Sequence, residues 1–221
     1  FSLEIADKEN NSENLKLNSS LSFDISGILK NNSYISLGFS KYKDAFNDRL
    51  VYDYKEDELG IAMFVPSSYG GYINWGSDSR LKNTFSLGLG WGKNEIEDWG
   101  YNIQYSHTYR PQYNMKLSFN YKYYKSNEKY HWLDIVGTSE DPHYIFCNSN
   151  NELQKFIIRF DAFLSKKLTL QNYTELIQTN NQFDNWMELE EGNMYPNETS
   201  FSSGIGLYAD ENSNPSPGQT V

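Results

Sequence analysis

The sequence predicts an all-β protein made of long antiparallel strands in up-and-down order, and three observations predict it. Apolar and polar residues alternate along much of the 221-residue chain, which is the period of a strand with one apolar face. The alternating segments are longer than the usual strand of about five or six residues. Short polar turns also alternate with longer polar loops along the chain, as expected when consecutive strands are neighbours.

About ten strands are expected from the alternation and from the turn residues that separate the alternating segments. They are residues 1–8, 14–26, 33–43, 71–79, 83–92, 99–109, 113–125, 153–164, 168–178 and 200–209. Short turns are expected near 27–32, 80–82, 110–112 and 165–167, and long or polar loops at 44–70, 93–98, 126–152 and 179–199. Residues 143–148 are expected to extend or decorate the top of a strand.

Three hairpins can be paired so that each has one mainly apolar face and one mainly polar face. A slip of one residue would exchange the two faces, so the pattern restricts the register. The expected pairs include Leu164–Leu168, Ala162–Leu170 and Asp161–Gln171 around 165–167, Tyr109–Tyr113, Tyr105–Leu117 and Ile103–Phe119 around 110–112, and Ile73–Leu89 around 80–82.

The length of the strands and the aromatic residues at their ends favour a membrane β-barrel over a soluble sandwich, which also alternates. Nine residues at about 3.3 Å each, tilted by about 40°, span roughly 23 Å, close to the apolar band of an outer-membrane barrel. Tyr and Trp prefer a boundary where the ring is buried and the polar tip is in water. We therefore expect an antiparallel up-and-down transmembrane β-barrel whose apolar face contacts the lipid bilayer.

The polar face is then expected to line a lumen filled with water. The candidates for lumen-facing residues are Arg159, Asp161, Gln171, Glu175, Gln104 and Lys116. Such groups can set the selectivity of a pore, or they can be paired charges on the wet face of a plugged barrel. The pairing of charges is the favoured interpretation.

Composition argues against several other classes of function. A formal net charge of -10 argues against nucleic acid as a partner. Cys147 is the single cysteine, so neither an internal disulfide nor a cysteine-based zinc site is expected. No catalytic or phosphate-binding motif occurs, so we expect no enzyme activity, no cofactor and no metal. Acidic residues in the long loops would suit a divalent cation, but a solvated acidic surface is the favoured interpretation.

Three segments of the chain, taken together, resemble one bacterial family. They are VPSSYGGYINWGSDSRL (65–81), FSLGLGWG (85–92) and HYIFCNSNNELQKFIIRFDAFLSKKLTLQNYTELIQ (143–178). The family is an outer-membrane β-barrel domain of unknown function that follows an N-terminal carbohydrate-binding module of the family-9 type. Tyr144-Ile145-Phe146 stands where members have Tyr-Val-Phe. Ser165-Lys166-Lys167-Leu168 stands where they have Thr-Pro-Asn/Asp-Leu, so the turn proline is missing.

The resemblance implies a porin-like barrel in the bacterial outer membrane, and it assigns carbohydrate binding to no residue of this sequence. The expected function is a non-enzymatic barrel that anchors a carbohydrate-binding module or passes a solute. The alternative is a hydrolase-associated or soluble all-β carbohydrate-binding module. We expect residues 1–209 to be part of a larger barrel, because Phe1 enters a strand without a signal segment and no apolar, aromatic closing strand ends the chain. Residues 210–221 are expected to be a polar coil.

Overall fold

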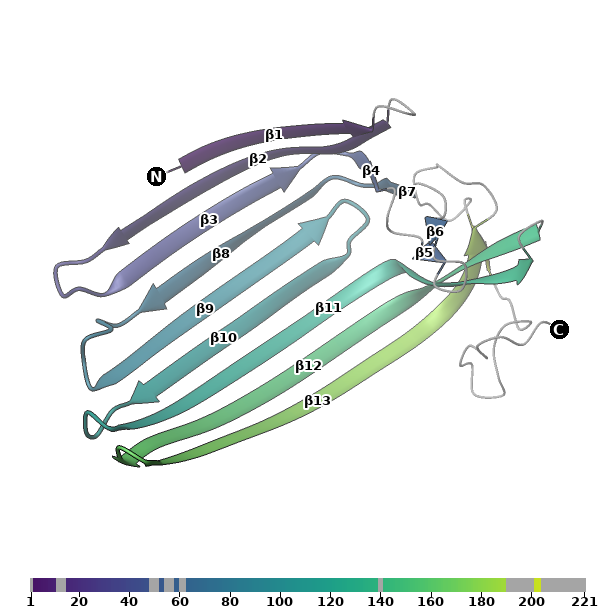
Figure 1. Ribbon diagram of the computed structural model, residues 1–221. Coiled ribbons are helices and arrows are strands. Elements are labelled where there is room, and N and C mark those ends of the chain that lie inside the picture. Colours follow the sequence, from purple (N-terminus) through teal and green to yellow (C-terminus); the bar gives the residue numbers. More distant parts are fainter. Residues whose placement is uncertain are drawn as a thin grey trace.

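The computed structural model shows an all-β protein, and it describes residues 2–10, 15–47, 52–53, 58–59, 63–138, 141–189 and 201–203 (Figure 1). The residues predicted as a polar tail, 210–221, lie outside these ranges. No helix that is long and apolar enough to span a membrane occurs in the described part of the chain. The main sheet contains β1 (Ser2–Asn10), β2 (Leu15–Ile28), β3 (Tyr34–Tyr42), β8 (Ser68–Gly76), β9 (Asn83–Asn94), β10 (Trp99–Tyr109), β11 (Met115–Thr138), β12 (Asp141–Ser165), β13 (Leu168–Leu189) and β14 (Phe201–Ser203).

These strands are antiparallel, and they follow one another across the sheet in the order β1-β2-β3-β8-β9-β10-β11-β12-β13-β14. The predicted up-and-down order is therefore confirmed. Within the described residues no pairing joins β1 to β13 or β14, so the sheet is open and is not closed into a barrel. Two further pairs, β4 (Ala45–Asn47) with β7 (Met63–Val65) and β5 (Tyr52–Asp53) with β6 (Glu58–Leu59), lie in the connection between β3 and β8.

The two ends of the strands carry different connections. Residues 29–33, 77–82, 110–114 and 166–167 join strands at one edge of the sheet, which we call the turn rim. Residues 43–67 and 95–98 join strands at the opposite edge, which we call the loop rim. The predicted polar loop at 93–98 is a tight turn, in which the amide of Asn94 donates to the carbonyl of Asp98 over 3.0 Å.

Two of the three predicted registers are confirmed. The β8–β9 hairpin pairs Ile73 with Leu89. The β12–β13 hairpin pairs Ala162 with Leu170 and Asp161 with Gln171. Only its tip differs, because a bulge between Phe163 and Ser165 makes Ser165, and not Leu164, the partner of Leu168.

The predicted register of the β10–β11 hairpin is wrong. Ile103 pairs with Tyr123 in place of Phe119, and Tyr109 pairs with Leu117 in place of Tyr113, so the strands are shifted by four residues. An even shift leaves every side chain on its face, and the apolar pattern cannot detect it. The longer turn, residues 110–114, decides the register instead.

The predicted loops at 126–152 and 179–199 are also wrong for the residues that are described. β11 continues to Thr138, β12 begins at Asp141 and β13 continues to Leu189, so residues 143–148 belong to a strand as expected. Register shifts between Glu128 and His131 and between Trp132 and Asp134 interrupt the pairing. A bulge breaks the alternation of period two, and the sequence pattern therefore hides these strands.

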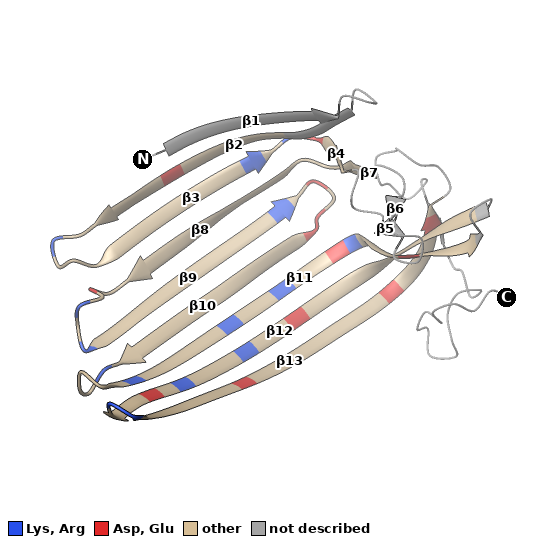
Figure 2. Cartoon of the chain, in the orientation of Figure 1, with Lys and Arg blue, Asp and Glu red and all other residues tan. Residues whose placement is uncertain are grey.

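Apart from Ala162 near the turn rim, the buried apolar side chains of the described residues gather at the loop rim. Met63 of β7 packs with Phe146 of β12 and with Met187 and Leu189 of β13. Tyr130, Trp132, Ile135 and Tyr144 pack against this rim cluster. No apolar layer formed by the described residues covers the rest of the sheet. Figure 2 shows that its charged residues are concentrated on β11, β12 and β13.

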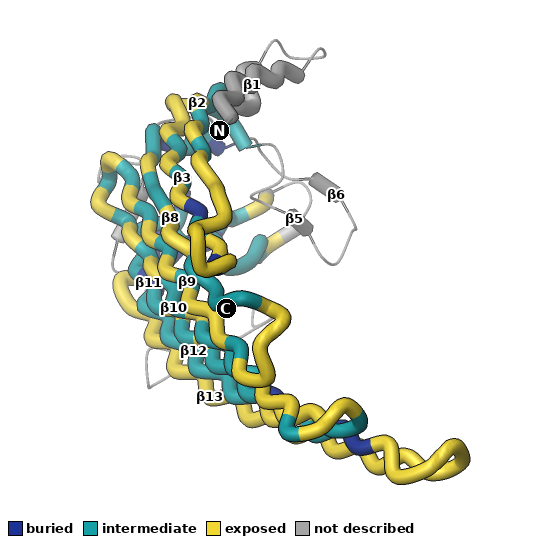
Figure 3. Tube along the Cα trace, turned by 90° about the vertical axis from the view of Figure 1, so that its left-hand side faces the viewer, coloured by how far each residue is buried: buried dark blue, intermediate teal, exposed yellow. Residues whose placement is uncertain are grey.

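The sheet is a curved layer (Figure 3). The small polar side chains of one face of the sheet are buried: Ser36 is 4% exposed and Ser118 is 8% exposed. The large apolar side chains of the opposite face remain open, and Leu37 is 42% exposed. Side chains converge on the inner side of a curved sheet, so we place the polar face on the concave side.

Candidate functional site: the two faces of the sheet

One face of the sheet is a broad apolar surface that no other part of the described chain covers. In its middle, Leu37, Ile73, Leu89 and Ile103 are aligned across four neighbouring strands by direct pairing. The exposed apolar residues of this face include Leu21, Phe23, Ile25, Leu37, Phe39, Ile73, Phe85, Leu87, Leu89, Trp91, Leu117, Ile158, Leu170 and Leu176. A soluble monomer rarely exposes a contiguous apolar patch beyond a few hundred Å², so this face requires a partner or an apolar environment.

Aromatic side chains mark both ends of this apolar face. Toward the loop rim, Tyr69 meets Trp91 edge-on at 5.9 Å, and Trp99 stacks on Tyr101 at 5.8 Å. Toward the turn rim, Trp75 contacts Phe85 with ring centroids 5.0 Å apart. The aromatic residues that the sequence placed at the strand ends therefore lie on the apolar face, toward both rims of the sheet. Rings in such positions suit a boundary between an apolar layer and water.

The six residues predicted to face a lumen all lie on the polar face, according to the strand pairing. Asp161 of β12 is 7% exposed and accepts hydrogen bonds from Arg159 Nε at 3.0 Å and Gln171 Nε2 at 3.2 Å. Lys116 of β11 is directly opposite Asp161. The structure therefore joins four of the six candidates in one group.

Glu175 lies farther along β13, where Lys155 Nζ is 2.5 Å from its Oε1 and the Tyr173 hydroxyl donates to its other oxygen. Gln104 lies apart on β10, opposite Lys122 of β11. Lys122 is also directly opposite Lys155, a placement of like charges that costs stability. Sequence reasoning did not select Lys122 and Lys155, although the same alternation places both on the polar face.

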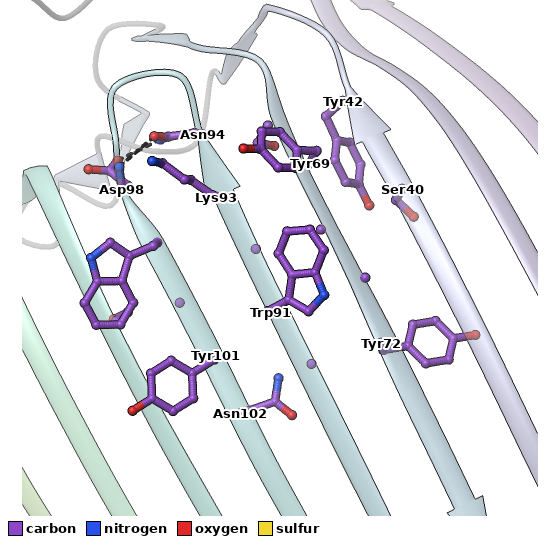
Figure 4. A pocket seen from close by; sticks show the side chains of 18 of the residues that line it. Ser40, Tyr42, Tyr69, Tyr72, Trp91, Lys93, Asn94, Asp98, Tyr101 and Asn102 are labelled. Atoms are coloured by element: carbon purple, nitrogen blue, oxygen red, sulfur yellow. Dashed lines mark hydrogen bonds between the residues drawn. The ribbon is translucent and has the colours of Figure 1, made fainter.

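The polar face also contains a cavity of ≈ 630 Å³ near the loop rim, between β3 and β11 (Figure 4). Glycines account for its depth, since Gly38, Gly70, Gly90 and Gly92 present no side chain. Tyr42, Tyr72, Tyr124, Asn94, Asp98 and Asn102 are among the residues around it. The sequence contains a signal for this cavity, because glycine occupies every second position of 88–92.

The Asp98 carboxylate is held at the edge of this cavity. Its Oδ1 accepts from the Lys129 amide at 2.7 Å and its Oδ2 from Asn94 Nδ2 at 2.8 Å. Burial raises the pKa of Asp98, and these two hydrogen bonds oppose that shift. This carboxylate is therefore part of the turn at 95–98 and not a free acid.

Side chains suited to metal binding do not converge in the described ranges. There, no three His, Cys, Asp or Glu side chains come together in a way that would hold a metal ion. His131, which falls in the predicted loop 126–152, lies on β11, and His143 lies on β12. His131 Nδ1 is 2.7 Å from Glu128 Oε2, and His143 contacts Glu188 on β13.

No family model, curated protein or solved structure matches the chain.

Proposed function

We propose that this chain forms part of the wall of a bacterial outer-membrane β-barrel that has no enzymatic activity and passes a solute. One observation carries the proposal: the apolar face is exposed over the whole body of the sheet, while the buried apolar cluster is confined to the loop rim. A soluble domain buries its apolar face against a second layer. Lipid would take the place of that layer here.

The dimensions of the apolar face support the proposal. The 11 residues of β10 would span about 28 Å at a tilt of about 40°. The apolar band of an outer-membrane barrel is about 25 Å tall, and girdles of aromatic residues flank it on both sides. The Tyr69–Trp91 and Trp75–Phe85 pairs lie near the two ends of β8 on this face.

The polar face supports passage of a solute over a purely anchoring role. Four cationic residues and three anionic ones lie on the polar face of β11, β12 and β13: Lys116, Lys122, Lys155 and Arg159 against Asp161, Glu175 and Glu128. This small positive excess is opposite in sign to the net charge of -10 of the whole chain. Cationic residues that line a pore favour anions, and we propose that the solute is anionic.

A soluble carbohydrate-binding module is the second candidate, and the glycine-floored cavity favours it. Tyrosine rings beside amide and carboxylate groups are suitable for stacking on a sugar and for hydrogen bonding to its hydroxyls. This function would leave the apolar face unexplained. A chain that stays monomeric without detergent, and that binds a glycan less well after Tyr124→Ala, would support this second candidate.

The test of the first candidate uses two adjacent residues of β10 that lie on opposite faces. Ile103→Arg should destabilise the chain folded in lipid vesicles by about 2–4 kcal/mol, the cost of Arg on the lipid face near the midplane. Gln104→Arg should cost at most about 1 kcal/mol, because the new charge remains in water and meets only the like charge of Lys122 directly opposite. Equal losses for the two variants in a denaturant titration would overturn the proposal.

A further inference from the structure

The apolar face has a groove where one strand lacks a side chain. Gly71 of β8 lies between its direct partners Phe39 of β3 and Trp91 of β9. The groove has a volume of ≈ 450 Å³. Its other apolar lining residues are Phe23, Ile25, Leu37, Ile73 and Leu89. A linear hydrocarbon chain lying along the strands would therefore contact apolar side chains on both sides.

Two lysines lie on the apolar face just beyond the end of this groove that is nearer the loop rim. Lys41 of β3 and Lys93 of β9 both pair with Tyr69 of β8, two residues beyond Gly71. Figure 2 shows the two positive charges at the ends of β3 and β9. Two strand spacings of about 4.8 Å separate their backbones by about 10 Å, a distance that two long side chains can bridge around one anionic group.

The two lysines are available for a ligand. In the described part of the chain, neither forms an ion pair. Glu97 is close enough to Lys93 to interact with it, but the pKa of Glu97 is lowered mainly by its hydrogen bond with Lys129 and less by Lys93. Lys125 lies on the same face but is directly opposite Glu152, so we leave it out of the site.

We propose that Lys41, Lys93 and the groove over Gly71 bind a membrane lipid with a phosphate-bearing, anionic headgroup. The phosphate lies between the two ammonium groups, and one acyl chain lies in the groove between Phe39 and Trp91. The site rests on the proposed membrane-embedded function. The charge of the ligand follows from complementarity, because two cations lie beside an apolar groove in a chain of net charge -10. The groove favours a lipid over free phosphate.

The test uses the fluorescence of Trp91, taken as the difference between the full chain and its Trp91→Phe variant. The chain is folded into phosphatidylcholine vesicles that contain a minor fraction of phosphatidylglycerol. Bromine, a contact quencher, is placed on the acyl chains of one lipid at a time, at equal mole fractions. Brominated phosphatidylglycerol should quench Trp91 more strongly, with a preference of about fivefold for each lysine.

Two double variants complete the test. Lys41→Gln with Lys93→Gln should remove most of the preference. A control variant that combines Lys166→Gln with Lys167→Gln at the turn rim should leave the preference for brominated phosphatidylglycerol unchanged. Equal quenching by the two brominated lipids, or a preference that survives loss of Lys41 and Lys93, would overturn the lipid site and leave the embedded sheet intact. Absence of quenching by either lipid would overturn the proposed function itself.

Discussion

The ring of Tyr72 on β8 covers the backbone of Gly38 on the neighbouring strand β3. A Cβ atom on Gly38 would come within 2.1 Å of Tyr72 Cε1 and within 2.4 Å of Asp24 Oδ1. The Tyr72 hydroxyl donates to that same Asp24 oxygen over 2.6 Å. A single glycine therefore leaves room for a contact that joins β2, β3 and β8 on the polar face.

Gly38→Ala should therefore destabilise the folded chain by about 1–3 kcal/mol, the usual cost of forcing extra volume into a packed site. The matched control is Gly27→Ala on β2, where an added Cβ meets nothing within 4 Å. That control should be neutral. Denaturant titrations of both variants in the same lipid vesicles provide the measurement, and equal losses would show that the contact with Tyr72 does not matter.

At the bulge that contains Asn185, glycine should leave the stability of the chain unchanged or raise it, and alanine should lower it. Asn185 has a φ of 51°, and Asn185 and Trp186 together lie opposite Cys147 alone. Beyond the bulge, Trp186 is buried, and Met187 and Leu189 belong to the rim cluster. Asn185→Ala should cost roughly 1 kcal/mol, because Ala lacks the short polar side chain that lets Asn adopt this left-handed conformation. Asn185→Gly, which removes the Cβ, should be neutral or stabilising. Unfolding of the two variants, followed by near-UV circular dichroism, tests the difference.

Cys147 should be an unreactive thiol in the folded chain. It is fully buried, and burial, with weaker effects of Asp184 and Glu128, raises its pKa to about 12. Only the thiolate attacks, so iodoacetamide at pH 8 should modify the unfolded chain rapidly and the folded chain very slowly. Folded-state alkylation as fast as that of the denatured chain would contradict the assigned packing.

Lys122→Glu should raise the stability of the folded chain and weaken the preference of the pore for anions. Lys122 and Lys155 are direct neighbours across β11 and β12, and a carboxylate opposite Lys155 would replace repulsion by attraction. A gain of about 0.5 kcal/mol is expected from such a cross-strand pair. In a pore that contains this wall, the preference for anions should weaken. Reversal potentials under a salt gradient measure that change, and a preference that stays the same would exclude Lys122 from the pathway.

The faces of the sheet were predictable because alternation with period two fixes the side on which each residue lies. The register of β12–β13 was predictable because a tight turn, Lys166-Lys167, limits the choices. The register of β10–β11 was not predictable from the alternation, since two registers that differ by four residues leave every side chain on the same face. Only the length of the turn at 110–114 decides between them. The extensions of β11, β12 and β13 were hidden by their bulges.

The candidate site was predictable to a similar extent. The grouping of Arg159, Asp161 and Gln171 followed from the alternation and one correct register. The place of Lys116 opposite Asp161, and the pairing of Lys122 with Lys155, required the register between β11 and β12. These are two strands that the sequence separated by a long loop. The cavity depends on the neighbours of each glycine in space. The lumen itself stays a prediction.

The central claim is that lipid contacts one face of the sheet and water contacts the other. Its most direct test is a spin-label scan of β10, with single cysteines at each residue of 101–108 in a Cys147→Ser background, folded into vesicles. The account predicts strict alternation: labels at odd-numbered positions should be accessible to oxygen dissolved in the bilayer, and labels at even-numbered positions to a water-soluble nickel chelate. Equal accessibility of neighbouring positions to the nickel chelate would contradict it.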